Sequence, residues 1–182
     1  MSDKQAIRSV ETSTWKATAT LDSIEDGNRV HADIGQQLDE LGYTGDEKHG
    51  VWIALEEAIA NGFKHGNQMV SGKKVEVSYT VTADGVFVRI VDEGDGFDPA
   101  DVSDPLADEN LERPSGRGLF LMRHYMNFVH VDPATKSVTM QKQRGVLTAG
   151  QLEAAARKEK KVNYCVDETS VKIDDRLKQV LQ

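Results

Sequence analysis

Hydrophobic and polar residues follow two different periods along this chain, and each period predicts a different kind of element. Alternation of apolar with polar residues predicts strands over 15–21, 74–81, 86–91, 128–131 and 137–141. Apolar residues at spacings of three and four predict helices over about 23–41, 46–66 and 118–126. We expect Asp22 or Ser23 to cap the first helix and Gly42 to end it. Turn residues at Ala83-Asp84-Gly85 and Asp132-Pro133 indicate two hairpins.

In chain order these elements run β-α-α-β-β-loop-α-β-β, with a long acidic loop over 95–114. This order predicts an α/β (α+β) two-layer sandwich, in which a mixed, mostly antiparallel sheet carries its helices on one face. Loops of that length usually act as lids or binding segments in compact domains. We expect one domain over 15–143, an N-terminal tail over 1–14 and a C-terminal extension over 144–182. The extension should begin with a polar helix over 149–161, followed by two short strands and a last helix.

Composition and charge argue against several classes of function. The chain has 182 residues and a formal net charge of -8, which disfavours nucleic acid or an anionic membrane surface as its main partner. No apolar run approaches the ~18 residues of a transmembrane helix, and the N-terminus lacks the basic and apolar parts of a signal peptide. A single cysteine, Cys165, cannot build a disulfide framework. We therefore expect a cytoplasmic protein.

Polar side chains share one face of the predicted helix that ends at His65-Gly66. Glu57, Asn61 and either Lys64 or His65 recur there at helical spacing, beside the apolar residues of the same helix. This pattern has two interpretations, a solvated helix face or a site. As a site, Asn61 would supply an oxygen ligand to Mg²⁺, which takes few protein oxygens together with phosphates and water. Glu57 would then be a general base beside it.

The predicted strand over 86–91 runs directly into the segment Asp92-Glu-Gly-Asp-Gly-Phe97. A carboxylate at the end of a buried strand can accept hydrogen bonds from an amino group of a ligand, and glycines let a ligand approach the backbone. The alternative interpretation is an ordinary acidic turn or bulge. Asp92, Gly94 and Gly96 are therefore candidate ligand contacts.

A glycine-rich entrance precedes the predicted helix over 118–126. Gly116 and Gly118 flank an arginine there, and the free amide groups at a helix start attract phosphate. Arg113 or Arg117 would add positive charge with bidentate geometry. The alternative is a flexible loop that caps a helix. The segment has neither the order of a P-loop nor a strand-adjacent Gly-x-Gly-x-x-Gly, which argues against the usual dinucleotide-binding motifs.

Taken in this order, the three segments resemble the N, G1 and G2 boxes of the ATPase superfamily that includes gyrase, ninety-kilodalton heat-shock chaperones, sensor histidine kinases and mismatch-repair ATPases. Within this superfamily, the anti-sigma-factor serine kinases have an N box that Glu57–Gly66 resembles. Their G2 box and the helix after it are similar to Gly116–Met122 followed by Tyr125–Val129. The resemblance covers about Trp15 to Lys142. It implies the Bergerat-type ATP-binding fold.

The resemblance also implies a role for each matched position. Asn61 would coordinate Mg²⁺ at the phosphates of ATP, and Glu57 would be the catalytic base that activates a serine hydroxyl on a partner protein. Asp92 would accept from the adenine amino group, with Gly94 and Gly96 shaping the base pocket. The long acidic loop would be the ATP lid. The other cofactor contacts implied by the resemblance are Lys64, His65, Phe97, Arg113, Gly116, Arg117, Gly118 and Leu119.

The leading hypothesis is an ATP-dependent serine protein kinase and anti-sigma factor, which binds a sigma factor and phosphorylates a serine of an anti-anti-sigma antagonist. One alternative is a non-catalytic ATP-binding module that sequesters a protein partner. Another is the ATP-binding half of a histidine kinase, for which the chain shows no dimerising helical hairpin. The resemblance suggests a homodimer, with no direct contact to nucleic acid or membrane. We expect Trp15 to lie in the core, with a dimer interface as the alternative. We expect His49, His124 and His130 to be ordinary surface or hydrogen-bonded residues.

Overall fold

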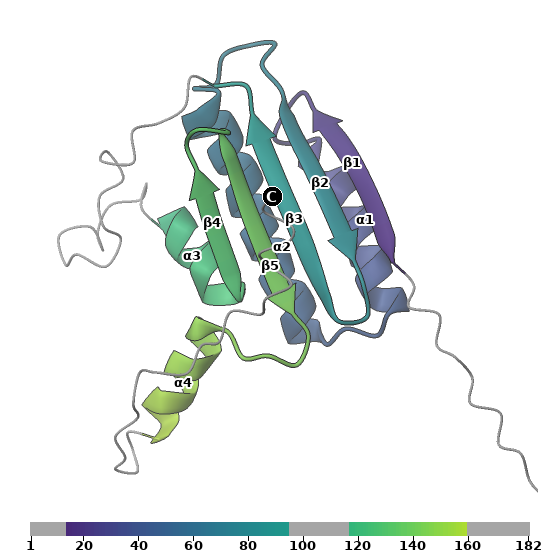
Figure 1. The fold of residues 1–182 in the computed structure, drawn as a ribbon, viewed down its shortest axis with the longest axis vertical. Helices are drawn as coiled ribbons and strands as arrows, with labels where there is room; N and C mark the ends of the chain where they lie inside the picture. The colour runs from purple at the N-terminus through teal and green to yellow at the C-terminus, as the bar shows by residue number, and fades with distance from the viewer. Residues whose placement is uncertain (1–13, 95–116, 160–182) are drawn as a thin grey trace, which may run out of the picture. The chain divides into compact units, whose positions relative to one another are not determined.

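The computed structural model describes residues 14–94 and 117–159 of the chain. Five strands form one sheet in the order β1-β2-β3-β5-β4 (Figure 1). Its strands are β1 (Trp15–Leu21), β2 (Val75–Val81), β3 (Gly85–Asp92), β4 (Phe128–Asp132) and β5 (Ser137–Gln143). Every neighbouring pair of these strands is antiparallel. The predicted two-layer α/β class is confirmed, and the order of elements along the described chain follows the prediction.

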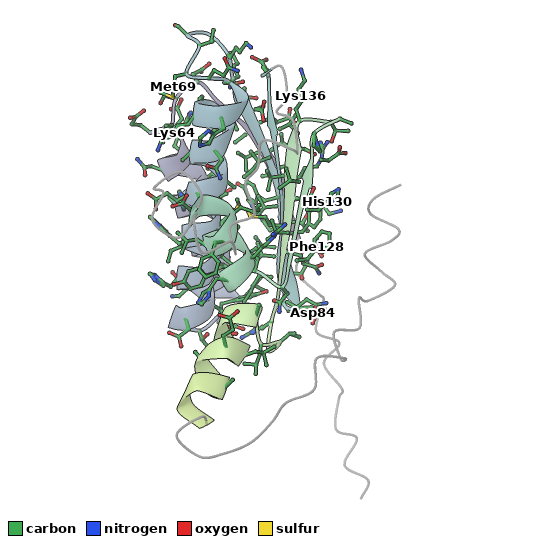
Figure 2. All side chains as sticks on the ribbon, turned by 90° about the vertical axis from the view of Figure 1, so that its left-hand side faces the viewer. Lys64, Met69, Asp84, Phe128, His130 and Lys136 are labelled. Atoms are coloured by element: carbon green, nitrogen blue, oxygen red, sulfur yellow. The ribbon has the colours of Figure 1, made fainter. Side chains whose placement is uncertain are left out.

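The helices form the second layer. They are α1 (Gly27–Glu40), α2 (Gly45–Asn61), α3 (Arg117–Tyr125) and α4 (Ala149–Glu159), and a π-helical turn, η1 (Gly62–Gly66), follows α2 directly. Figures 1 and 2 show α1, α2 and α3 on the same face of the sheet. The chain divides into two compact units, Met1–Leu152 and Glu153–Gln182, so α4 begins in the first unit and ends in the second. None of the described helices is long and apolar enough to cross a membrane.

The hydrophobic core lies between the two layers, where the alternation along the strands places every second side chain. In β2 the alternate residues Val75, Val77, Tyr79 and Val81 are buried. Their partners from the helices include Val30, Ile34, Leu38, Val51, Leu55 and Ile59. The helices α1, α2 and α3 leave the outer face of the sheet uncovered, and Phe128 and His130 project from that face in Figure 2.

For the first helix, the predicted end is correct and the predicted start is misplaced. Gly42 ends α1 in the left-handed conformation, with a φ of 68° that favours glycine. The start of α1 lies at Gly27 rather than after Asp22 or Ser23. The carboxylate of Asp26 turns back and accepts hydrogen bonds from the amides of Asp22 and Ser23, at 3.0 and 3.2 Å. The Ser23 hydroxyl accepts in return from the amide of Asp26 at 3.3 Å. Ser23 therefore caps a turn that precedes α1, and the sequence pattern does not distinguish this turn from the first turn of the helix.

The two ends of α2 also differ from a single uninterrupted helix over 46–66. At its start the hydroxyl of Thr44 accepts from the amide of Glu47, and the Glu47 carboxylate accepts from the amide of Thr44, which is a complete capping box. Regular α-helix stops at Asn61, and the wider turn of η1 continues to Gly66. The helical register predicted for Lys64 and His65 therefore breaks at Gly62.

Trp15 and the histidines test two further expectations. Trp15 is 44% exposed, so the expected core position was wrong. It is the first residue of the edge strand β1, which has only β2 as a neighbour among the described strands. His49 and His130 are exposed as expected. His124 departs from the expectation, because its Nδ1 is buried and has no hydrogen-bond partner among the described residues.

Candidate functional site

The last turns of α2 bring an acid and an amide against the start of α3. Glu57 and Asn61 are one turn apart on α2, and both are partly buried. A Cβ atom built on Gly118 would lie 2.8 Å from Oε2 of Glu57 and 2.9 Å from Nδ2 of Asn61. Only a residue without a side chain fits there without displacing these groups. The structure therefore brings together the helix residues and the glycine-rich entrance, which are about a third of the chain apart in sequence.

Neither Glu57 nor Asn61 makes a side-chain hydrogen bond with any residue that the structure describes. Two carboxylate oxygens and an amide group thus remain available beside the backbone of Gly118. Oxygen donors of this kind suit Mg²⁺, which binds one or two protein oxygens and completes its shell with phosphates and water. The described residues contain no group of three or more His, Cys, Asp or Glu side chains that could hold a metal by themselves.

The turn after α2 is a π-helix, a rare conformation that is frequent at functional sites. The amide of Asn67 donates to the carbonyl of Gly62 at 2.7 Å and closes this wide turn. Gly62 packs on β2, where an added Cβ would lie 3.2 Å from a methyl group of Val75. Lys64 and His65 lie on the exposed side of the turn, and neither donates a side-chain hydrogen bond to a described residue.

Asp92 is the last residue of β3, as the sequence predicted. Its Oδ1 accepts a hydrogen bond from the amide of Gly94 at 2.9 Å. The carboxylate packs directly on the backbone of Gly66, where any added side chain would overlap it. Gly94 is buried as well, and a side chain there would overlap the carbonyl of Gly66. The end of β3 and the end of η1 are therefore in contact through two glycines.

The electrostatics of Asp92 follow from this burial. Loss of solvent raises the pKa of the Asp92 carboxyl above its ordinary value, against the opposing effects of the Gly94 amide and the positive charges of Lys136 and Lys73. No other described residue donates to Oδ2 of this carboxylate. A half-buried carboxylate with one free oxygen is suited to accept a hydrogen bond from an amino group of a ligand.

Two contributors to this region were missed among the predicted site residues. Gly66 forms the surface against which Asp92 packs, and Asn67 is a buried polar residue, only 1% exposed. Gly66 ends the matched helix segment, and Asn67 directly follows it in sequence. The contact of Gly66 with Asp92 joins residues 26 positions apart and has no local signal.

The remaining predicted residues divide into two groups. Leu119 lies in α3, partly buried against the hydrophobic core. Arg117 is the first residue of α3, and its side chain is not among those described. The predicted contacts Gly96, Phe97, Arg113 and Gly116, together with the predicted lid over 95–114, lie outside the described residues.

Comparison with known proteins adds an independent line of evidence. A family model described as histidine kinase-like ATPase domain matches residues 18–142, a range that includes Glu57, Asn61, Asp92 and Gly118. The chain is 32% identical over 97 residues to the serine-protein kinase RsbW of Bacillus subtilis (strain 168), an alignment that covers 50% of this chain and 61% of the relative. It is 34% identical over 103 residues to the anti-sigma F factor of Priestia megaterium, covering 54% and 69%.

A second anti-sigma F factor, from Clostridium beijerinckii, is 32% identical over 96 residues, covering 51% of this chain and 66% of the relative. The chain therefore spans about three fifths to two thirds of the length of these curated relatives.

Proposed function

This chain belongs to the family of histidine kinase-like ATPase domains, and on that premise we propose that it binds ATP with Mg²⁺ and transfers the γ-phosphoryl group to a serine of a protein partner. Phosphoryl transfer depends on positioning and on charge stabilisation more than on covalent chemistry with the enzyme. The site would therefore need an adenine contact, a metal ligand, phosphate-binding amides and a proton acceptor.

Each of these tasks has a candidate residue. Asp92 accepts from the adenine amino group, and the amides at the start of α3 around Gly118 bind phosphate oxygens. Asn61 holds Mg²⁺, which would neutralise charge on the phosphates when it is bound. Glu57 takes the proton of the serine hydroxyl as the serine oxygen bonds to the γ-phosphorus. The bond from that phosphorus to the bridging oxygen breaks at the same time, and ADP leaves.

One observation carries this assignment. Glu57 and Asn61 lie against the backbone of Gly118, without hydrogen bonds to other described side chains. A helix face that served only stability would be expected to expose such groups to water or to pair them within the chain. A proton acceptor and a metal ligand beside the amides of a helix start form the arrangement that phosphoryl transfer requires.

The proposed partners come from the relatives and from the motifs. Similarity to an anti-sigma F factor and to a serine-protein kinase supports a sigma factor as binding partner. The resemblance of the N and G2 boxes to anti-sigma-factor kinases adds an anti-anti-sigma antagonist as the phosphate acceptor. Exchange between the two partners would be biased by nucleotide and by phosphorylation of the antagonist. We also propose that the chain forms a homodimer, which sedimentation at several concentrations would test.

The experiment begins with nucleotide binding. Isothermal titration of the purified chain with ADP, with and without MgCl2, should give a saturable, Mg²⁺-dependent affinity. The chain is then incubated with Mg-ATP and individually purified antagonist proteins of the same organism, and phosphoserine is detected by mass spectrometry. If the chain does not bind ADP even in the presence of MgCl2, the whole assignment is contradicted.

The variant Glu57→Gln separates catalysis from binding. It should keep ADP affinity within about threefold and lose about 10²- to 10⁴-fold in transfer rate, because only the proton acceptor is removed. Glu56→Gln is the matched control, since Glu56 is the neighbouring acid on α2 and is exposed. Equal transfer by both variants would contradict the role of Glu57. If neither variant nor wild type transfers phosphate, and both variants still hold the sigma factor, the chain is a non-catalytic binding module.

A further inference from the structure

Asn67 is a buried polar residue that the proposed chemistry does not use. Its side chain is 1% exposed, and both ends of its amide are occupied by backbone groups. Nδ2 donates to the carbonyl of Lys74 at 2.9 Å, and Oδ1 accepts from the amide of Glu93 at 2.9 Å. The Glu93 carboxylate in turn accepts from the amide of Lys74 at 2.7 Å. The three residues form a closed ring that ties η1, β2 and the end of β3 together.

The chemistry of this ring requires an asparagine. One partner is a carbonyl, which needs a donor, and the other is an amide, which needs an acceptor. An aspartate has the same shape but would set a carboxylate oxygen against the Lys74 carbonyl. An alanine would leave both backbone groups without their present partners in a partly buried place, where an unsatisfied group is costly.

The ring acts directly on the peptide group after Asp92. The Glu93 amide that Asn67 holds is the nitrogen of that peptide group, and the Asp92 amide on the other side donates to the Lys136 carbonyl at 3.1 Å. The Asp92 carboxylate is then confined between the backbone of Gly66 and the amide of Gly94. With the backbone fixed on both sides, the direction of the free oxygen is fixed as well.

We propose that Asn67 is a positioning residue that aims Asp92 at the amino group of the base and thereby determines a preference for adenine over guanine nucleotides. The inference rests on the proposed function, because it assumes that the site binds a nucleotide. Adenine presents an amino group at the position where guanine presents a carbonyl oxygen. A carboxylate aimed there accepts from adenine and repels guanine, whereas a carboxylate free to turn away discriminates less.

The test measures selectivity rather than affinity alone. Kd values for ADP and GDP, each with MgCl2, are measured by titration calorimetry for wild type, Asn67→Ala and Asn67→Asp. We expect the ratio of the GDP to the ADP constant to fall about tenfold in both variants, the equivalent of one well-placed hydrogen bond. If the substitutions reduce stability but leave the orientation of Asp92 unchanged, the binding of ADP and GDP should weaken equally, and the ratio of the two constants should not change.

Asn127 provides the matched control. It also bridges backbone groups, since Nδ2 donates to the carbonyl of Leu147 at 3.1 Å and Oδ1 accepts from the amide of Gln143 at 2.8 Å. It lies between α3 and β4, on a turn that makes no hydrogen bond with Asp92 in the described part of the chain. Asn127→Ala should lower the melting temperature and leave the GDP-to-ADP ratio at the wild-type value.

Each outcome separates this inference from the function on which it rests. Wild type that binds neither nucleotide contradicts the proposed function itself. If wild type prefers ADP and the Asn67 variants keep the same GDP-to-ADP ratio, only the role of Asn67 is contradicted. If the variants do not fold, hydrogen exchange of the wild-type protein without nucleotide provides the test. The Glu93 amide should then exchange as slowly as the amides in the middle of the strands. Rapid exchange at Glu93 would overturn the inference.

Discussion

The two ends of α2 differ in how the chain satisfies the polar groups that lie there. At the start, Arg144 donates to the carbonyls of Leu41, at 2.9 Å, and of Gly42. Its guanidinium lies 4.7 Å from the ring centre of Tyr43. The other Glu47 oxygen accepts from the amide of Gly145 at 3.2 Å, in addition to the capping box. The chain itself satisfies the polar groups described there.

The other end of α2 is arranged in the opposite way. Glu57 and Asn61 face Gly118 without side-chain partners among the described residues, and η1 replaces a simple cap. Gln68 and Met69 follow with positive φ angles of 51° and 55°, a conformation that non-glycine residues rarely adopt. Backbone strain and unpaired polar groups persist where function requires them. We therefore expect substitutions at the start to change stability alone, and those at the end to change nucleotide binding.

The largest effect is expected for Gly94→Ala. A side chain there would overlap the carbonyl of Gly66, so backbone must move at the contact between β3 and η1. We expect a loss of about 3 kcal/mol in the free energy of unfolding, typical of severe overpacking, together with loss of ADP binding. Urea denaturation and calorimetry would measure the two effects.

Gly35→Ala is the control for that substitution. Gly35 lies inside α1, its φ is ordinary, and apart from its chain neighbours and the nearby helix backbone no atom lies within 4 Å of the place that a Cβ would take. Alanine should therefore raise the free energy of unfolding by about 0.5–1 kcal/mol through helix propensity. A Gly94→Ala protein that is as stable and binds as well as Gly35→Ala would show that the described contact is not tight.

Asp92→Asn is expected to separate binding from stability. Loss of the charged acceptor should weaken the affinity for ADP about 10- to 100-fold, the range for a hydrogen bond to a charged group. Burial raises the pKa of the Asp92 carboxyl in the folded state, so ionised Asp92 opposes folding at neutral pH. This opposition disappears as the pH falls through the folded-state pKa, because protonation then favours the folded protein.

The melting temperature of Asp92→Asn at neutral pH should consequently equal or exceed that of wild type, and the difference should shrink as the pH is lowered. Wild-type affinity for ADP should fall over the same acidic range, since a protonated Asp92 is a poorer acceptor. Thermal scans and titrations at matched pH values test both. A variant that binds ADP normally would place the base contact elsewhere.

Arg144→Ala should reduce stability at the start of α2. It removes hydrogen bonds to the carbonyls of Leu41, Gly42 and Ala83 and the interaction with the Tyr43 ring, and we expect a loss of about 2 kcal/mol in the free energy of unfolding. The ADP affinity should not change. The control is Arg29→Ala, whose exposed ion pair with Asp26 contributes about 0–1 kcal/mol. A marked drop in ADP affinity for Arg144→Ala would show that the two ends of α2 are coupled.

Thr44→Ala is expected to have the smallest effect. It removes the hydroxyl that caps α2 and should cost about 1 kcal/mol, with unchanged ADP affinity. Thr44→Ser keeps the hydroxyl and should stay close to wild type. Equal melting temperatures for the alanine and serine variants would mean that the capping box adds nothing measurable in this protein.

Local patterns were enough to predict most of the fold. Alternation located the strands to within a residue or two, and Gly42 marked the real end of a helix, because each signal depends on neighbours in sequence. The start of α1 was misplaced because Ser23 and Asp26 exchange side-chain-to-backbone hydrogen bonds that close a separate turn before the regular helix begins at Gly27. Trp15 was misplaced because its exposure depends on where the sheet ends.

The candidate site was predictable to a lesser depth. Residue types and spacing singled out Glu57, Asn61, Asp92 and Gly118, since the chemistry proposed for each depends on its residue type and on its place in a helix or strand. Gly66 and Asn67 were not assigned to the site, because their contacts involve groups of β2 and β3 that no sequence spacing relates to them.

The sequence by itself determined the elements, the order in which they occur and the kinds of side chain placed at their ends, because periodicity and capping are local properties of the chain. Only the tertiary structure decided that Glu57 and Asn61 meet Gly118, that Asp92 packs on Gly66 and that α2 ends in a π turn. These features depend on how closely two backbones approach once the helices pack on the sheet. Such distances are set by packing throughout the core rather than by any single segment.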